Sequence, residues 1–126
     1  MNVLIVDTSC WISYLKGTPN SDLDLGLKEG RVFLPPLVVS ELLSARLKPA
    51  EKQQLLSFLK ELPLCDTPFE HWVRAGELRY RMATKGFTLS TPDAHIAQCC
   101  LDIEGYLLAE DAIFKKLSKV SELKIL

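Results

Sequence analysis

The chain has 126 residues and a formal net charge of −1, from 15 Lys and Arg against 16 Asp and Glu. Apolar residues make up 48% of it, which suits one buried core and excludes a disordered tail, a fibrous protein or a multidomain assembly. The charge excludes the strongly basic field typical of proteins that coat nucleic acid, although a local basic groove stays open. We expect one domain over residues 1–126.

The cysteines and the first residues of the chain indicate a reducing compartment. No Cys-x-x-Cys pair occurs among the four cysteines, which are Cys10, Cys65, Cys99 and Cys100. We therefore expect reduced, buried thiols. Residues 1–6 lack the basic segment of a secretory signal, and no apolar run is as long as a membrane span. We therefore expect a cytoplasmic protein without membrane contact.

The first half of the chain begins with a short apolar run at 3–6. This run is rich in β-branched residues, as in a strand buried on both faces of a parallel sheet. Prolines and glycines then divide the sequence into further elements. We predict a helix through 11–15 that ends near Gly17, a strand at 31–34, a helix that starts at Pro35-Pro36 and carries Glu41, a helix from Pro49 through 55–59, and a strand at 62–65.

The second half continues the alternation of helices and strands. Thr67 to Glu70 reads as a capping box with proline at the first helical position, and its helix runs to about Thr84, with Gly86 as its stop. We predict next a helix from Thr91 through Cys100, a strand at 105–108, a helix at 111–117 and a strand at 123–126. This alternation predicts a three-layer α/β/α domain with a mostly parallel central sheet.

Four acidic residues occupy special places in this predicted fold. Asp7 directly follows the first strand, and Asp111 closely follows the strand at 105–108, so both are expected at the carboxyl edge of the sheet. Glu41 lies one or two turns into a helix that leaves that edge, and Asp93 lies in the first turn of its helix. We expect the four side chains to converge.

Converging carboxylates repel one another and raise one another's pKa values, so such a cluster is costly without a cation. Ligand sets made of oxygen alone select hard ions, here Mg²⁺ or Mn²⁺. The expected chemistry is metal-assisted phosphodiester hydrolysis. Each acid alone also has a plainer interpretation, as a helix cap or dipole partner for Asp7, Asp93 and Asp111 and as a solvated residue for Glu41.

Other candidate sites are weaker. His95 and Cys99 are four residues apart and could bind zinc, but no second pair has ligand spacing. We expect His95 near the site or at the surface, and His71 at the surface. A Cys–His hydrolase lacks a cysteine at a strand end, an aspartyl-phosphate phosphatase would need an acid in place of Ser9, and no glycine-rich phosphate loop is present.

Short segments around the four acids carry a family resemblance. They are Val6-Asp7-Thr8-Ser9, Ser40-Glu41-Leu42, the stretch 92–97 and the stretch 107–114. With these segments in this order, the chain resembles the PIN-domain nucleases, specifically the small VapC-type toxins of type II toxin–antitoxin pairs. The resemblance implies a PIN-like fold and an endoribonuclease whose Mg²⁺ or Mn²⁺ is held by Asp7, Glu41, Asp93 and Asp111, with Ser9 beside them.

The sequence departs from the family pattern near the fourth acid. Ala109 stands where the family often has threonine, and Ile113 stands where it often has a second acid. Asp7, Glu41 and Asp93 therefore carry the prediction more strongly than Asp111, and the adjacent Glu110 is an alternative to Asp111. The resemblance further implies that Asp7 and Asp93 matter most for metal binding. These departures leave open a catalytically inactive PIN-like binding module. A phosphatase or a DNA nuclease built on the same acids is a third interpretation.

The resemblance also implies partners. They are an RNA substrate, a cognate antitoxin that covers the site and a second copy in a homodimer. Setting the four acids aside leaves 15 basic against 16 − 4 = 12 acidic residues, a mild bias that favours salt-sensitive RNA contact. An antitoxin helix would need an apolar face, for which 42–47 and 55–59 are candidates. Trp11 and Trp72 are expected in packing contacts rather than stacked on bases.

Overall fold

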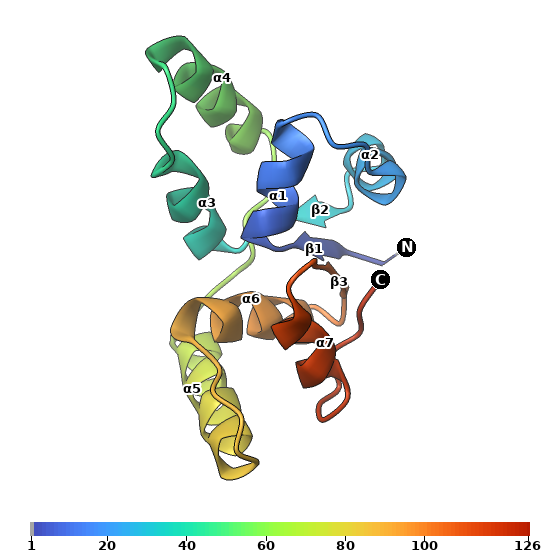
Figure 1. The fold of residues 1–126 in the computed structure, drawn as a ribbon, viewed down its shortest axis with the longest axis vertical. Helices are drawn as coiled ribbons and strands as arrows, with labels where there is room; N and C mark the ends of the chain where they lie inside the picture. The colour runs from blue at the N-terminus through green and yellow to red at the C-terminus, as the bar shows by residue number, and fades with distance from the viewer. Residues whose placement is uncertain (1) are drawn as a thin grey trace.

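A short parallel sheet is the middle layer of the fold in the computed structural model, which describes residues 2–126 (Figure 1). Its strands are β1 (Leu4–Val6), β2 (Val32–Phe33) and β3 (Tyr106–Leu108), in the order β2-β1-β3. Both neighbours pair with β1 in parallel, so the carboxyl ends of the strands share one edge. The apolar run of β1 is fully buried because it is the central strand.

Helices cover both faces of this sheet, which confirms the predicted three-layer α/β/α architecture. In Figure 1, α1 to α4 lie on one side of the sheet, and α5 to α7 lie on the other. No helix within residues 2–126 has the length and apolar character needed to cross a membrane. The helices are α1 (Thr8–Leu15), α2 (Ser21–Lys28), α3 (Pro36–Leu43), α4 (Pro49–Lys60), α5 (Phe69–Thr84), α6 (Thr91–Asp102) and α7 (Ala112–Ser118).

Two predicted strands are reduced to single bridges. The segment 62–65 pairs with the sheet only between Leu34 and Leu64, and the segment 123–126 only between Leu107 and Ile125. Pro63 has no N–H to donate to a ladder, and the chain soon turns into α5, so the first of these pairings cannot lengthen. The central sheet is therefore narrower than the sequence predicts.

Helix α2 was not predicted from the sequence. Asn20 caps it, since its side-chain oxygen accepts from the backbone N–H of Leu23. Gly26 interrupts the apolar pattern, but a Cβ there would lie 3.0 Å from Leu4 Cδ2 and 3.1 Å from Val32 Cγ2. The glycine lets α2 pack closely on β1 and β2. The same residue interrupts the apolar pattern by which the helix could have been predicted.

The predicted capping box of α5 is wrong. Helix α5 begins at Phe69 with Pro68 as its N-cap, and no side chain makes a capping hydrogen bond there. Thr67 lies one residue too early to cap this helix. The predicted stops are confirmed, because Gly17 and Gly86 take positive φ angles of 102° and 75° just after α1 and α5.

Candidate metal centre

The four predicted acids line one cavity at the carboxyl edge of the sheet. The cavity has a volume of about 170 Å³. Its acids come from four segments, because Asp7 follows β1, Asp111 follows β3, Glu41 lies in α3 and Asp93 lies in α6. The lining residues are Asp7, Thr8, Ser9, Glu41, Asp93, Ile96, Asp111 and Phe114.

Asp7 is the most enclosed of the four acids, with 3% of its surface exposed. Its Oδ1 caps α1 by accepting from the backbone N–H of Cys10 at 2.8 Å, and the Ser9 hydroxyl lies 3.2 Å from both carboxylate oxygens. Burial raises the pKa of Asp7, the nearby charge of Glu110 adds to this, and the hydrogen bonds from Cys10 and Ser9 oppose it. Asp7 therefore does cap α1 through its Oδ1, while its Oδ2 contacts the hydroxyl of Ser9, which also lines the cavity.

Glu41 and Asp93 reach the cavity from two different helices. The Thr8 hydroxyl donates to Glu41 Oε1 at 2.6 Å and so ties α3 to the start of α1. Asp93 lies in the first turn of α6, where its backbone N–H donates to the cap residue Ser90. Burial raises the pKa of Asp93, and the charges of the other three acids raise it further. Asp93 therefore lies within electrostatic range of the other three acids.

Asp111 and Glu110 take different positions. Asp111 caps α7 through a bond from the backbone N–H of Ile113 at 3.0 Å, and it lines the cavity. Glu110 is not among the lining residues, and its Oε2 lies 3.4 Å from the Ser13 hydroxyl. Asp111 is consequently the better placed of the two to complete a carboxylate set.

The negative charge of the cavity is not balanced by any cationic side chain among its lining residues. None of its lining residues is Lys, Arg or His, and none of the four acids forms an ion pair within the described part of the chain. Carboxylates and two hydroxyls make a ligand set of oxygen alone. Such a set fits a hard divalent cation, which would offset the burial and the repulsion that raise the pKa of Asp93.

Sequence reasoning missed two features beside these acids. The first is the Thr8 hydroxyl on Glu41, which the run of hydroxyl residues after Asp7 could have indicated. The second is His71, whose predicted surface location is wrong because its side chain is fully buried. His71 Nδ1 lies 2.8 Å from Asp102 and its Nε2 lies 2.9 Å from His95 Nδ1, so two polar partners compensate for its burial.

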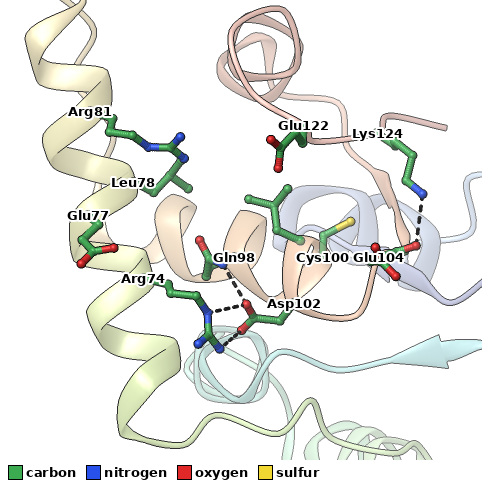
Figure 2. A pocket seen from close by; sticks show the side chains of 12 residues that line it. Arg74, Glu77, Leu78, Arg81, Gln98, Cys100, Asp102, Glu104, Glu122 and Lys124 are labelled. Carbon is green, nitrogen blue, oxygen red and sulfur yellow. Dashed lines mark hydrogen bonds and ion pairs between the residues drawn. The ribbon is translucent and has the colours of Figure 1, made fainter.

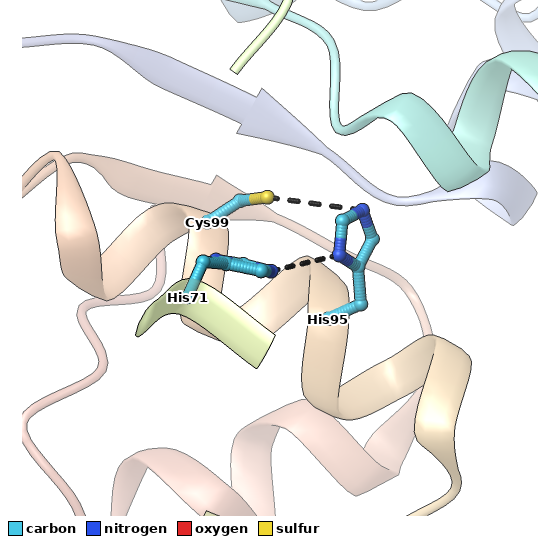
Figure 3. Close-up of side chains that lie close together, drawn as sticks. All are labelled: His71, His95 and Cys99. Atoms are coloured by element: carbon cyan, nitrogen blue, oxygen red, sulfur yellow. Dashed lines mark hydrogen bonds between the residues drawn. The ribbon is translucent and has the colours of Figure 1, made fainter. Parts of the chain in front are cut away.

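The residues that could bind zinc, His71, His95 and Cys99, already take part in hydrogen bonds. One potential ligand atom each from His71, His95 and Cys99 lie within 4.8 Å of one another (Figure 3). However, every ring nitrogen of the two histidines has a hydrogen-bond partner. Burial lowers the pKa of His95 to about 4, so this ring is neutral without any ion. The cluster is accounted for as a hydrogen-bond network.

A larger cavity of about 750 Å³ lies on another part of the molecule, between α5, the end of α6 and the C-terminal segment (Figure 2). Its charged side chains have both signs, among them Arg74, Arg81, Glu77 and Glu122. None of the predicted site residues lines it. The small acidic cavity, rather than the larger one, is where the chemistry-bearing side chains meet.

Comparisons with known proteins agree on the type of fold. The family model described as PIN domain matches residues 4–120. Among curated proteins none matches the sequence. A solved structure of VapBC2 from Rickettsia felis bound to a DNA fragment from their promoter is similar with a TM-score of 0.80 and 22% identity, over 98% of this chain and 97% of that one.

Two further solved structures are similar over almost their whole length. DNA-bound VapBC from Salmonella typhimurium has a TM-score of 0.82 and 18% identity, over 100% of this chain and 98% of that one. VapBC-5 from Mycobacterium tuberculosis, described as a member of the VapBC family of toxin–antitoxin systems, has a TM-score of 0.71 and 17% identity, over 100% and 98%. At these identities the likeness establishes the fold.

Proposed function

The chain belongs to the PIN domain family, and from this premise we propose that it is a Mg²⁺- or Mn²⁺-dependent endoribonuclease, the toxin of a type II toxin–antitoxin pair. One observation carries the proposal. Four carboxylates from distant parts of the sequence line one cavity with no cationic side chain among them. The similar VapBC structures support the toxin assignment, because their fold is shared over nearly the whole chain.

The proposed roles follow from how each side chain is held. Asp7 and Asp93, assisted by Glu41 and Asp111, would hold the ion, which would neutralise phosphate charge and favour attack by water. Ser9 orients the carboxylate of Asp7, and Thr8 orients that of Glu41. These hydroxyls fix the carboxylates before substrate arrives, so less reorganisation is needed during the reaction.

Cleavage of total RNA by the purified, antitoxin-free protein tests this proposal. Reactions with Mg²⁺, with Mn²⁺ and with EDTA, beside panels of DNA and phosphomonoesters, separate a ribonuclease from a DNA nuclease or a phosphatase. Metal-dependent cleavage of RNA alone supports the proposal. Metal-dependent turnover of DNA or phosphomonoesters in place of RNA contradicts it, and no turnover on any substrate favours the inactive binding module.

The proposed antitoxin has a candidate docking surface on α3, the helix that also contributes Glu41 to the acidic cavity. An apolar groove of about 370 Å³ runs between α3, which carries Glu41, and α4. Leu64 at its edge has 56% of its surface exposed although it is large and apolar. An amphipathic helix that places its apolar face in this groove would bury such side chains. The groove is lined by Pro36, Val39, Leu56, Leu59, Lys60, Leu62 and Leu64.

Leu64→Glu is expected to uncouple the toxin from its antitoxin while leaving the toxin active. The substitution puts a charge at the edge of the groove, and burying that charge against an apolar helix would cost more free energy than the remaining contacts contribute. Cells that co-express toxin and antitoxin should grow with the native chain and stop growing with the variant. Continued growth of cells that co-express Leu64→Glu and the antitoxin would contradict this placement. Gln54→Glu, at an exposed position of α4, is the matched control for an added charge.

The proposed homodimer has a candidate surface on α5. Phe69, Trp72, Val73 and Tyr80 form one exposed apolar stripe along this helix, with exposed fractions of 42 to 77%. At Gly76, in the middle of the stripe, a Cβ would meet nothing within 4 Å. An antiparallel second copy that crosses there would bring Trp72 of each chain against Tyr80 of the other, because both lie four residues from the glycine.

Tyr80→Glu is expected to convert the dimer to a monomer. Tyr80 is 73% exposed in the single chain, so its replacement does not disturb the core. Sedimentation velocity at micromolar concentration should give a dimer for the native chain and a monomer for the variant. If both sediment alike, α5 is not the interface, and Gln54→Glu again provides the control for an added charge.

A further inference from the structure

Buried hydrogen bonds link the helices that carry two of the acids. Resting on the proposed function, we propose that His71 and His95 are positioning residues for the metal site. They would act through a continuous chain of hydrogen bonds that runs from Asp102 to the first turn of α3 and so holds Asp93 and Glu41 in register. Neither histidine lines the acidic cavity, so both would act through the helices.

The outer end of the chain is anchored by a guanidinium. Arg74 on α5 donates from Nε to Asp102 Oδ1 at 2.8 Å and from Nη2 to Oδ2 at 3.1 Å (Figure 2). Gln98 Nε2 also donates to Asp102 Oδ1 at 2.8 Å. These bonds lower the pKa of Asp102 despite its partial burial, so the group is a carboxylate that can only accept hydrogen bonds.

The inner end of the chain reaches α3 through two rings. His71 Nδ1 lies 2.8 Å from Asp102 Oδ2. On the other side of the same ring, His71 Nε2 lies 2.9 Å from His95 Nδ1 (Figure 3). The backbone N–H of Leu37 donates to His95 Nε2 at 3.4 Å. The Trp72 ring stacks on His95 at 4.7 Å with an interplanar angle of 7°, which fixes the plane of that ring.

Only one arrangement of protons satisfies every bond in this chain. The backbone N–H of Leu37 can only donate, so His95 Nε2 accepts and the His95 ring carries its proton on Nδ1. His71 Nε2 must then accept from His95 Nδ1, and His71 Nδ1 donates to the carboxylate of Asp102. An additional proton on either ring would place two donors face to face at some bond. The direction of hydrogen bonding is thus determined from Asp102 to Leu37.

His95 supplies a cap that α3 cannot make for itself. The N-cap residue of α3 is Pro35, which has no side-chain acceptor and makes no capping bond. The N–H of Leu37 is one of the first-turn donors that a helix leaves without a partner. A ring nitrogen from α6 fills this role, so the start of α3 is tied to α6 rather than to its own sequence.

The two ends of the His95–Leu37 hydrogen bond lie close in sequence to two of the acids, on α6 and on α3. His95 is two residues after Asp93 on α6, and Leu37 is four residues, about one turn, before Glu41 on α3. A shift of α3 against α6 would change the separation of these two carboxylates. Since ligand positions determine affinity for a divalent ion, a loss of this tie should weaken metal binding even where the fold persists.

Binding of Mn²⁺ without RNA, followed by the electron paramagnetic resonance signal of the free ion, tests the proposal. His95→Leu removes the ring's bonds to His71 and Leu37 and is expected to weaken Mn²⁺ binding by about tenfold, a usual effect of outer-shell changes. His95→Gln keeps an oxygen that can accept from Leu37 and should restore most of the affinity. Met82→Ala is the matched control, because it removes a buried side chain of α5 that takes no part in the hydrogen bonds from Asp102 to Leu37.

The outcomes separate this inference from the function on which it rests. If the native protein binds no Mn²⁺ and cuts no RNA, the proposed function fails. If it binds Mn²⁺ and His95→Leu binds as tightly, only the positioning role fails. If Met82→Ala or His95→Gln weakens binding as much as His95→Leu, the effect is general destabilisation, which also overturns the inference. Should His95→Leu not fold, Asp102→Ala at the outer end is expected to weaken binding less, and native affinity in that variant overturns the inference.

Discussion

Asp93→Asn is expected to lower the rate of RNA cleavage by about three orders of magnitude. The substitution keeps the size of the side chain but removes a charged ligand from the proposed metal site. A bound ion contributes several kcal/mol to the transition state, and each 1.36 kcal/mol corresponds to about a factor of ten in rate. Burial raises the pKa of Asp93, and the charges of the other three acids raise it further, so its carboxyl group lies close to all of them.

The matched control is Glu110→Gln. It removes the same charge close to the cavity, but from a residue that does not line it. Cleavage that falls with Asp93→Asn and persists with Glu110→Gln supports Asp111 as the fourth acid together with the site itself. Equal activity of the native protein and Asp93→Asn would contradict the proposed site, and it would trace any cleavage seen to a contaminant or to other chemistry.

The convergence of the acids could be predicted because each position depends on a local rule. Asp7 and Asp111 follow apolar strands, and the carboxyl ends of parallel strands meet at one edge whatever lies between them in sequence. Asp93 follows a proline that marks the start of a helix. The structure places all four around one cavity, while their roles as ligands remain a prediction.

The buried network behind the acids could not be predicted, because its partners are far apart in sequence. His71 is 31 residues from Asp102 and 24 from His95, and nothing local to any of them marks the contact. Asp102 looks like a surface charge and His71 like a surface histidine until α5 packs on α6. The same holds for α2, whose glycine has a role only once β1 and β2 lie beneath it.

The acidic cluster should make the metal-free native protein less stable than the Asp93→Asn variant. The raised pKa values of Asp7 and Asp93 mean that folding disfavours their charged forms, mainly through burial. Above the raised folded pKa this cost is fully present, and it disappears as the pH falls through that pKa towards the ordinary value of 3.8. Asp93→Asn should therefore melt at a higher temperature than the native chain at neutral pH, and the difference should shrink in acid.

Adding metal should reverse that order at neutral pH. A ligand that binds only the folded state stabilises it by about 2.7 kcal/mol at 100 times its Kd, which corresponds to roughly 10 °C in Tm for a domain of this size. Thermal melting in EDTA and in Mn²⁺ should show this rise for the native chain and little of it for Asp93→Asn. A rise of equal size in both would mean that the ion binds elsewhere. A native chain already more stable than Asp93→Asn in EDTA would show that the carboxylates are compensated within the protein, and the electrostatic argument for a metal would then fail.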